Sequence, residues 1–356
     1  MRSLHKMLCQ MLRQRSLLIS VSLTVADRRM GVHRWQNVLL GALIASCGVA
    51  AIEWVARSAG YRPAVHDSRE LWHLWRQRIP AGDPRVVVLL GTSRMQSDVS
   101  IATMESCLPG HLVVQLAVEG PSSSVGIFEG LANDPSFCGV VICELETPLL
   151  ERSRWSDLHS YWAYDPPSLP RYWDGIARNW IGDKLVAMQP AFTLRSCFAR
   201  LAGDLSVPGR SHVSMRFSRE TQLDFGRLSD REDYRRRAAE QFRARYEGNP
   251  IARFESVQQE IKSVDDLARG LESRGGRAVF IRMPSFGDHW RIEEEFHPKA
   301  NWDRFASMTQ ATCIHFRDVA EMRGLNSPDE SHLDFRDAPR FTRALVRELR
   351  LRGVVQ

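Results

Sequence analysis

Cysteine is scarce in this chain, and no pattern among its cysteines is typical of a zinc site. Seven cysteines are spread over 356 residues, with no CxxC pair and no Cys/His cluster at zinc-ligand spacing. Five of them follow the N-terminal apolar stretch, so at least one should be free or should pair with another chain. Cys107 with Cys138 is one option for an internal disulfide. The sequence therefore excludes a zinc-finger protein.

Nucleic-acid-binding motifs are also absent. The formal net charge is +6, but the basic residues are scattered and form no homeodomain or RNA-binding module. Hydrophobic residues make up 44% and charged residues 25% of the chain, which are ordinary values for a globular protein. We therefore expect neither a nucleic-acid partner, nor a disordered chain, nor a polytopic membrane protein.

The chain has one long apolar stretch, close to its N-terminus. Residues 38–52 carry no charge, and with Val55 and Ala56 the apolar span is about 20 residues, the length that crosses a bilayer. Seven Lys/Arg and a single acid, Asp27, precede Trp35. Basic flanks stay in the cytoplasm. We therefore predict a single-pass anchor at 36–56 in the inner (cytoplasmic) membrane, with the following domain periplasmic or otherwise extracytoplasmic.

Two alternatives to an uncleaved anchor remain at this point. A buried core helix could have the same composition. A chain that starts at Met30 would resemble a bacterial lipoprotein precursor, with Cys47 as the lipidated residue. The apolar stretch continues past Cys47, which favours the uncleaved anchor.

Four short apolar runs predict strands of a parallel sheet: 85–90, 111–117, 139–145 and 277–283. The segments 97–108 and 122–133 between them are long enough for helices, as in βαβ units. Near the C-terminus, Asp337 is a plausible N-cap for a last helix. The pattern predicts a three-layer α/β domain.

The region 151–250 interrupts this rhythm. It is rich in aromatic residues and then in charge, and it predicts a helical insertion or lid. The predicted segments are a cytoplasmic basic segment 1–35 (starting at Met30 in the shorter alternative), the anchor 36–56, a connector 57–84, the first part of the α/β domain 85–150, the lid 151–250 and the second part 251–356.

Ser93 occupies a position suited to chemistry. The sequence Gly91-Thr92-Ser93 directly follows the first strand and precedes a predicted helix. Such a turn at the carboxyl edge of a parallel sheet exposes a hydroxyl and offers main-chain N–H groups to an anion. Alone, a serine here could equally be a helix N-cap.

A second motif near the C-terminus supplies partners for this serine. Asp329 and His332 are three residues apart in a loop before the last helix. At this spacing the carboxylate can orient the imidazole, and His332 can remove the serine proton. We predict Ser93, Asp329 and His332 as catalytic residues. Taken alone, the motif could merely shape a turn.

The serine after strand one and the Asp-x-x-His before the terminal helix resemble the SGNH/GDSL hydrolase superfamily. The Thr92 in place of the usual Asp resembles its membrane-linked branch, which acts on bacterial cell-surface polysaccharides. The resemblance covers about 85–150 and 277–350 and implies a flavodoxin-like three-layer α/β/α SGNH fold. It also implies an oxyanion hole made by the N–H groups of Ser93 and Gly120.

The third family motif is missing. The family supplies an oxyanion-hole Asn after the third strand, whereas this chain has Glu144 and Glu146 there. A carboxylate would repel an oxyanion, so we expect both to point away or to pair with Arg94 or Arg282. Loss of one such donor typically costs about 2.7–4 kcal/mol of transition-state stabilisation.

Three residues are candidates for substrate contact: Arg94 beside the serine, and His289 and Trp290 in the loop after the strand at 277–283. The loop could equally pack beneath the lid.

The resemblance implies a serine esterase or O-acyltransferase that acts on acyl, most often acetyl, esters of cell-envelope polysaccharides or other acylated glycans. We expect it to need no metal or organic cofactor. The alternative is a non-catalytic accessory protein of SGNH-like fold, which binds glycan or other envelope-assembly proteins.

Overall fold

The computed structural model describes residues 32–120, 124–146, 150–153, 155, 168–189, 211–248 and 254–356. The chain divides into two compact units, residues 1–59 and 60–356. Each is described separately.

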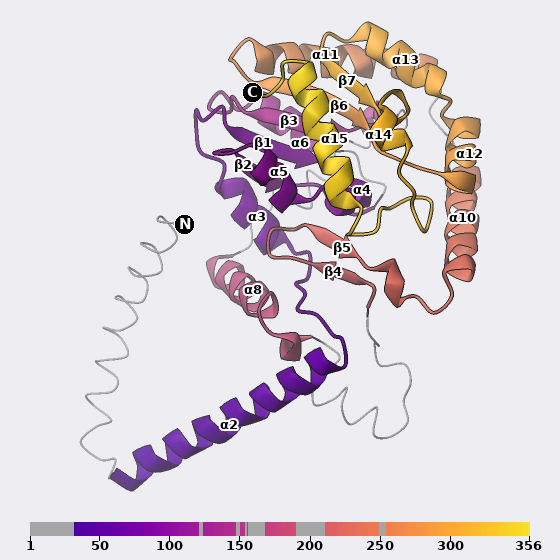
Figure 1. The fold of residues 1–356 in the computed structure, drawn as a ribbon. Helices are drawn as coiled ribbons and strands as arrows, with labels where there is room; N and C mark the ends of the chain where they lie inside the picture. Colours follow the sequence, from indigo (N-terminus) through magenta and orange to yellow (C-terminus); the bar gives the residue numbers. More distant parts are fainter. Residues whose placement is uncertain are drawn as a thin grey trace. The chain divides into compact units, whose positions relative to one another are not determined.

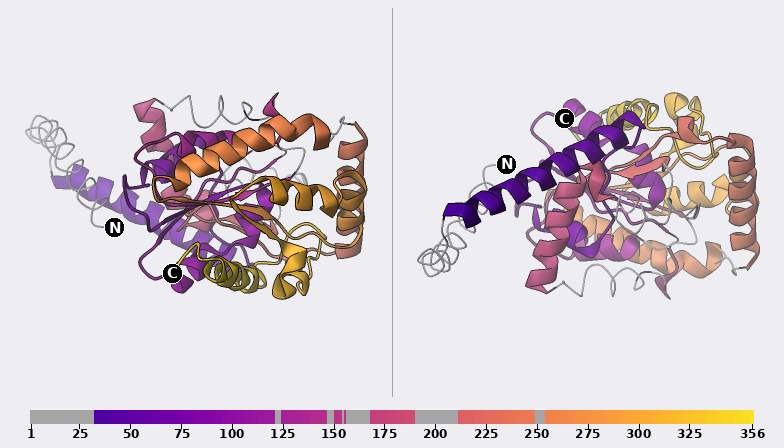
Figure 2. Two further views of the ribbon diagram at one scale, coloured as in Figure 1. Left: turned by 90° about the horizontal axis from the view of Figure 1, so that it is seen from above. Right: turned by 90° about the horizontal axis from the view of Figure 1, so that it is seen from below.

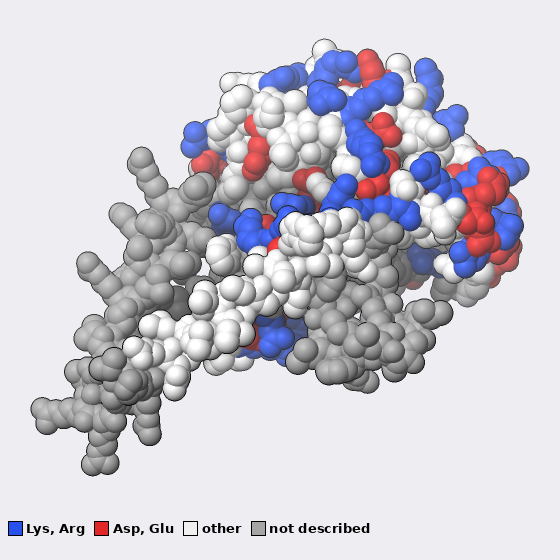
Figure 3. Space-filling view, turned by 60° about the horizontal axis from the view of Figure 1, so that its bottom comes forward, with Lys and Arg blue, Asp and Glu red and all other residues white. Residues whose placement is uncertain are grey.

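The first unit contains one long helix, α2 (Val32–Ser58). Its segment Trp35–Ser58 is 24 residues long, has a mean hydropathy of 2.0 and has none of its most apolar window buried. Figure 3 shows this helix as a nearly uncharged rod. By length and composition it can cross a bilayer, as a membrane anchor or as a signal sequence. Cys47 is exposed on it.

The second unit is built on a five-stranded sheet with the order β2-β1-β3-β6-β7 (Figure 1). Every neighbouring pair in it is parallel. Counted within this sheet, the order is 2-1-3-4-5, the flavodoxin-like order. The strands are β1 (Val86–Leu90), β2 (Leu112–Gln115), β3 (Val140–Glu144), β6 (Arg277–Arg282) and β7 (Thr312–His315). The predicted parallel α/β fold is confirmed; β7 was not predicted.

Helices cover both faces of this sheet, as Figure 2 shows in its left view. Alternate side chains of the buried strand β1 enter two separate cores, Val88 one and Val87 the other. The first core is closed by α6 (Val125–Ala132), α11 (Gln258–Glu272) and α13 (Lys299–Met308), and the second by α4 (Ser93–Asp98), α5 (Ile101–Cys107), α14 (Ala320–Arg323) and α15 (Ala338–Leu351). The layers are therefore α/β/α. Asp337 precedes α15 as predicted, but its side chain makes no cap hydrogen bond.

The connector and the described part of the insertion contain helices and strands that the sequence did not predict. The connector contains a helix, α3 (Arg69–Gln77), whose Leu71 and Trp72 are buried. The described part of the insertion is not purely helical, because a hairpin stands between its helices. Its elements are α8 (Leu169–Gly182), β4 (Val213–Met215), β5 (Thr221–Leu223) and α10 (Arg231–Gly248), and α10 packs beside α12 (Gly287–Phe296).

A buried arginine joins the insertion to the sheet. Arg219, in the β4–β5 turn, is 0% exposed and forms an ion pair with Asp67 at 2.8 Å. Its guanidinium also donates to the carbonyls of Gln115 (2.8 Å), the last residue of β2, and of Ala117 (2.9 Å), which lies just beyond it. The hairpin therefore holds the carboxyl end of β2.

The option of a disulfide between Cys107 and Cys138 is not realised, since both are free thiols. Cys107 ends α5 and packs against the core beneath α15, whereas Cys138 lies just before β3. Cys9 and Cys197 lie outside the described residues.

Candidate active site

Ser93 is the first residue of α4 and lies at the carboxyl edge of the sheet. It follows β1, which stands between β2 and β3 where the strand order reverses, the usual ligand position in open α/β sheets. Gly91 leaves room for the Glu144 side chain here, because a Cβ at this position would lie only 2.6 Å from Glu144 Oε2. The backbone N–H of Ser93 is at the first helical position, where no intrahelical acceptor exists.

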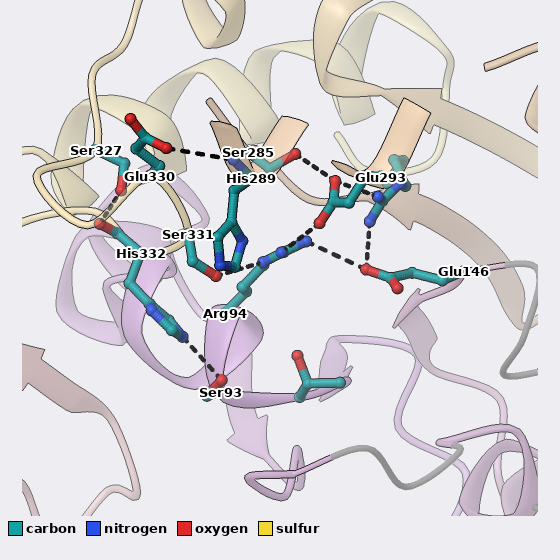
Figure 4. A network of polar contacts seen from close by, with 12 residues as sticks. Ser93, Arg94, Glu146, Ser285, His289, Glu293, Ser327, Glu330, Ser331 and His332 are labelled. Carbon is teal, nitrogen blue, oxygen red and sulfur yellow. Dashed lines mark hydrogen bonds and ion pairs between the residues drawn. The ribbon is translucent and has the colours of Figure 1, made fainter. Parts of the chain in front are cut away.

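The structure brings Ser93, His332 and Asp329 together (Figure 4 shows the first two). Ser93 Oγ lies 2.9 Å from His332 Nε2, although the residues are 239 apart in sequence. His332 Nδ1 lies 2.9 Å from Asp329 Oδ2. With the proton of the neutral ring on Nδ1, directed at the carboxylate, Nε2 can accept the Ser93 hydroxyl proton. The contacts agree with the sequence prediction for these three residues, and their catalytic role stays a prediction.

Asp329 is held by its own loop. Its Oδ1 accepts the amides of Ser331 at 2.9 Å and His332 at 2.6 Å, and the Ser327 hydroxyl at 3.0 Å. Burial opposes its charge, but His332 and these donors outweigh burial and lower the pKa of Asp329 to about 2. Burial likewise lowers the pKa of His332, but Asp329 outweighs it and the net pKa is raised. The pair therefore keeps Asp329 ionised.

Gly120 occupies a conformation that glycine favours, with φ of 112°. It ends the described stretch that follows β2, and residues 121–123 lie outside the described residues. Its role as an oxyanion donor remains a proposal.

The two glutamates after the third strand have separate partners. Glu144 is buried, and its Oε2 accepts from the amide (2.7 Å) and hydroxyl (2.9 Å) of Thr92. Glu146 pairs with Arg94 at 3.2 Å and with Arg282, as expected. Ionised Glu146 offers no hydrogen-bond donor, and Oε2 of Glu144, whose pKa is raised by burial, already accepts from Thr92. The described chain has no Asn after β3 to complete the oxyanion hole.

Arg94 belongs to a buried cluster of four charges, here called the ionic ring: Arg94, Glu146, Arg282 and Glu293. Both arginines bridge both glutamates, and each reaches Glu293 at 2.5 Å. The ring joins α4, the end of β3, the end of β6 and α12, as Figure 4 shows for its labelled members. Burial opposes the charge of Arg94, but Glu293 and Glu146 outweigh burial and raise its pKa.

These contacts correct the prediction of Arg94 as a substrate contact. Its side chain is 6% exposed, and all three guanidinium nitrogens already bind protein groups. No motif in the sequence marks Glu293, which lies within α12.

His289 and Trp290 lie on α12; His289 is buried, whereas Trp290 is half-buried and its contact with substrate stays a prediction. His289 is 5% exposed and stacks on Phe242 of α10, with ring centroids 3.8 Å apart. Burial lowers its pKa to about 3, so it is neutral. Trp290 packs edge-on against Phe316, and Arg317 lies over its ring. The alternative, that this segment packs beneath the insertion, fits His289.

Two residues of the insertion interact electrostatically with the triad and were not predicted from the sequence. His212 has its pKa lowered, mainly by burial, and it interacts electrostatically with Asp329 and His332. Tyr234 of α10 has its pKa raised, mainly by burial and also by Asp329. His212 and Tyr234 contact each other edge to face, with centroids 5.2 Å apart. No motif marks either residue.

Comparisons with known proteins give little beyond this. No protein-family model matches the sequence, and no curated protein matches it. Among solved structures, the chain is similar to TesA at 13% identity, over 75% of this chain and 98% of that one, with a TM-score of 0.35. The order and direction of the five strands define the fold class. Within the described residues, no group of three His, Cys, Asp or Glu side chains could hold a metal ion.

Proposed function

We propose that this chain is an SGNH-type serine esterase or O-acyltransferase that forms an acyl-enzyme on Ser93. The observation that carries the proposal is the pair of 2.9 Å contacts from Ser93 to His332 and from His332 to Asp329. A serine is a weak nucleophile until a positioned base removes its proton. His332 is at hydrogen-bond distance for that task, and Asp329 stabilises the imidazolium that results.

The chemistry follows from these three residues. Ser93 Oγ attacks the ester carbonyl while its proton passes to His332 Nε2. The tetrahedral intermediate collapses, and the leaving alkoxide takes that proton from His332. Water or a sugar hydroxyl then attacks the acyl-Ser93 ester and gives its proton to His332. The acyl–Oγ bond breaks, His332 returns the proton to Ser93 Oγ, and the carboxylic acid or the acylated glycan leaves. Entry of water makes the protein an esterase, and entry of a glycan hydroxyl makes it an acyltransferase.

The substrate class rests on the family resemblance and on α2. We propose acyl, most often acetyl, esters of extracytoplasmic glycans, with α2 as a single-pass anchor in the cytoplasmic membrane. The seven basic residues before Trp35 support an outward-facing catalytic domain.

The second candidate is a non-catalytic accessory protein that binds a glycan or assembly partners. The observation that favours it is the side chain of Glu144, an acceptor bound to Thr92 where the family has an Asn donor. A missing donor would slow catalysis by about 10²–10³-fold, which a slow enzyme could tolerate.

The test uses the purified full chain in detergent, with an activated acetyl ester and, separately, a fluorophosphonate probe. We expect hydrolysis and covalent labelling at Ser93. Ser93→Ala should lose both, with the rate falling by about 10⁴-fold or more. Ser307→Ala, an exposed serine on α13, is the matched control and should keep both. Equal rates from wild type and Ser93→Ala, without labelling, would exclude the enzyme and favour the accessory role. Adding an oligosaccharide acceptor separates transfer from hydrolysis.

A further inference from the structure

The helix that begins with Ser93 contacts the triad loop on both sides of His332. The triad loop is defined here as residues 327–333. Arg94 Nε donates to Ser331 Oγ at 3.1 Å, and the Leu333 amide donates to Asp98 Oδ1 at 2.9 Å. Ser331 and Leu333 are the neighbours of His332 in sequence. The same helix therefore carries the nucleophile and both contacts that flank its base.

These two contacts are shielded from water. Arg94 is 5% exposed, Asp98 0%, Ser331 7% and Leu333 0%. A buried polar contact does not compete with solvent, and losing one partner leaves the other unsatisfied. Arg94 and Asp98 are also four residues apart, so they lie on the same side of α4.

The carboxyl group of Asp98 is unusual for a simple backbone acceptor. Its Oδ1 accepts from Leu333 and from Ser97 at 2.8 Å, but its Oδ2 is buried with no hydrogen-bond partner in the described part of the chain. Burial of a half-satisfied carboxyl is costly, and a neutral acceptor would serve Leu333 equally well. Asp98 also interacts with the His332 imidazole, whose pKa it raises.

We propose that Arg94 and Asp98 are positioning residues that hold His332 opposite Ser93, and that Asp98 in addition favours the imidazolium formed during catalysis. This inference rests on the proposed function. Its physical basis is that Ser93 and His332 come from segments far apart in the chain, and that a displacement of about 1 Å can cost about 10²-fold in rate.

Other titratable or charged groups also interact with His332. They are Asp329 from the triad loop, Arg94 from α4, His212 from the insertion and His289 from α12. Burial raises the pKa of Asp98 to about 7, so its carboxylate form is present above that pH. Substitutions at Asp98 should therefore be compared at pH 8 as well as at pH 6.

Three variants of the full chain separate position from charge. Asp98→Asn keeps an acceptor for Leu333 but removes the charge. Asp98→Ala removes both, and Ser331→Ala removes the acceptor of Arg94 while leaving the ionic ring intact. The matched control is Asp265→Ala, a buried aspartate elsewhere in the fold whose Oδ1 likewise accepts a loop amide, that of Gln310, at 2.9 Å.

Three readouts are measured on each variant: kcat and KM for the acetyl ester, hydrogen exchange of the triad-loop amides, and the His332 pKa by NMR. Asp98→Ala should lower kcat by about 10–100-fold with little change in KM and should speed exchange in residues 327–333. Asp98→Asn should restore slow exchange and most of kcat, but its His332 pKa should be lower than that of the wild type. Ser331→Ala should show a smaller loss of kcat, and Asp265→Ala should leave all three readouts at wild-type values.

The proposal is overturned if Asp98→Ala leaves exchange and kcat unchanged, or if Asp265→Ala speeds triad-loop exchange equally. Should Asp98→Ala fail to fold, Asp98→Asn and Ser331→Ala decide: a wild-type His332 pKa in the first and a wild-type kcat in the second overturn it. Exchange and the His332 pKa need no turnover. An inactive wild type would therefore refute the proposed function, while these two readouts would still test the positioning.

Discussion

The ionic ring and the triad are two neighbouring charge clusters that use the same kinds of residue differently. In the ring, the side chain of Glu293 is 0% exposed and that of Arg94 is 6% exposed, and the opposite charges pair with one another. In the triad, the His332 side chain is 22% exposed, and Asp329, its partner, is 5% exposed. A cluster that only holds elements together is closed to water, whereas one that reacts must leave an atom within reach of substrate. Removing a triad member should therefore cost rate, and removing Glu293 from the ring should mainly cost stability.

The largest effect should come from Asp329→Asn, which breaks the triad alone. The amide can still accept the loop N–H groups, but it no longer stabilises the imidazolium or fixes the proton on Nδ1. We expect kcat for the acetyl ester to fall by about 10⁴-fold, together with a modest loss of thermal stability because the charge of Asp329 stabilises the folded state. The control is Asp334→Asn, five residues further along. Asp334 likewise accepts a backbone amide, that of Phe225, at 3.1 Å. A loss of rate matched by an equal loss in Asp334→Asn would contradict a specific role for Asp329.

Next in size is Glu293→Ala, which breaks the ring. It leaves two buried arginines with Glu146 as their only ring partner, and loss of one member of a buried ion pair costs about 3–5 kcal/mol. Denaturant unfolding measures this change. The control is Asp303→Ala, which removes an exposed pair with Lys299 and should cost about 0–1 kcal/mol. Similar losses in the two variants would show that the ring is not a main source of stability.

As pH falls through the His332 pKa, the rate should fall while the contribution of His332 to stability rises. His332 must be neutral to accept the serine proton, and its pKa lies above the ordinary 6.5. Below that raised pKa, kcat/KM should fall by about tenfold per pH unit. The raised pKa stabilises the folded state below pH 6.5, and this contribution is lost as pH rises through the folded value. The lowered pKa of Asp329 stabilises the fold above 3.8 and is lost as pH falls towards 2.

The pair therefore contributes most to stability between about pH 3.8 and 6.5, where His332 is protonated and the expected rate is low. A pH–rate profile and thermal unfolding over pH 3–9 measure both trends. Asp329→Asn should flatten this part of the stability curve. The assignment of His332 as the base would be contradicted if the rate and the pair's contribution to folding stability were highest at the same pH.

Much of the fold was readable because buried parallel strands are continuous apolar runs. The runs at 85–90 and 277–283 predicted β1 and β6 within one residue at each end. The strand β7 was not predicted because Thr312–His315 is only four residues long and ends in a histidine. The hairpin within the insertion was not predicted for a similar reason, since its strands have three residues each. Short strands carry too little periodicity to distinguish them from loops.

The sequence by itself determined the elements whose signal is local. These are an apolar helix long enough for a bilayer, the buried strands, a serine at a strand–helix turn, and an aspartate and a histidine three residues apart. Only the tertiary structure decided which of these meet. It placed Ser93 Oγ 2.9 Å from His332, turned Glu144 to Thr92, and enclosed Arg94 among carboxylates rather than leaving it for substrate. The reason is that a side chain's partners depend on which segments the sheet brings to one edge, and residues distant in sequence carry no local record of that contact.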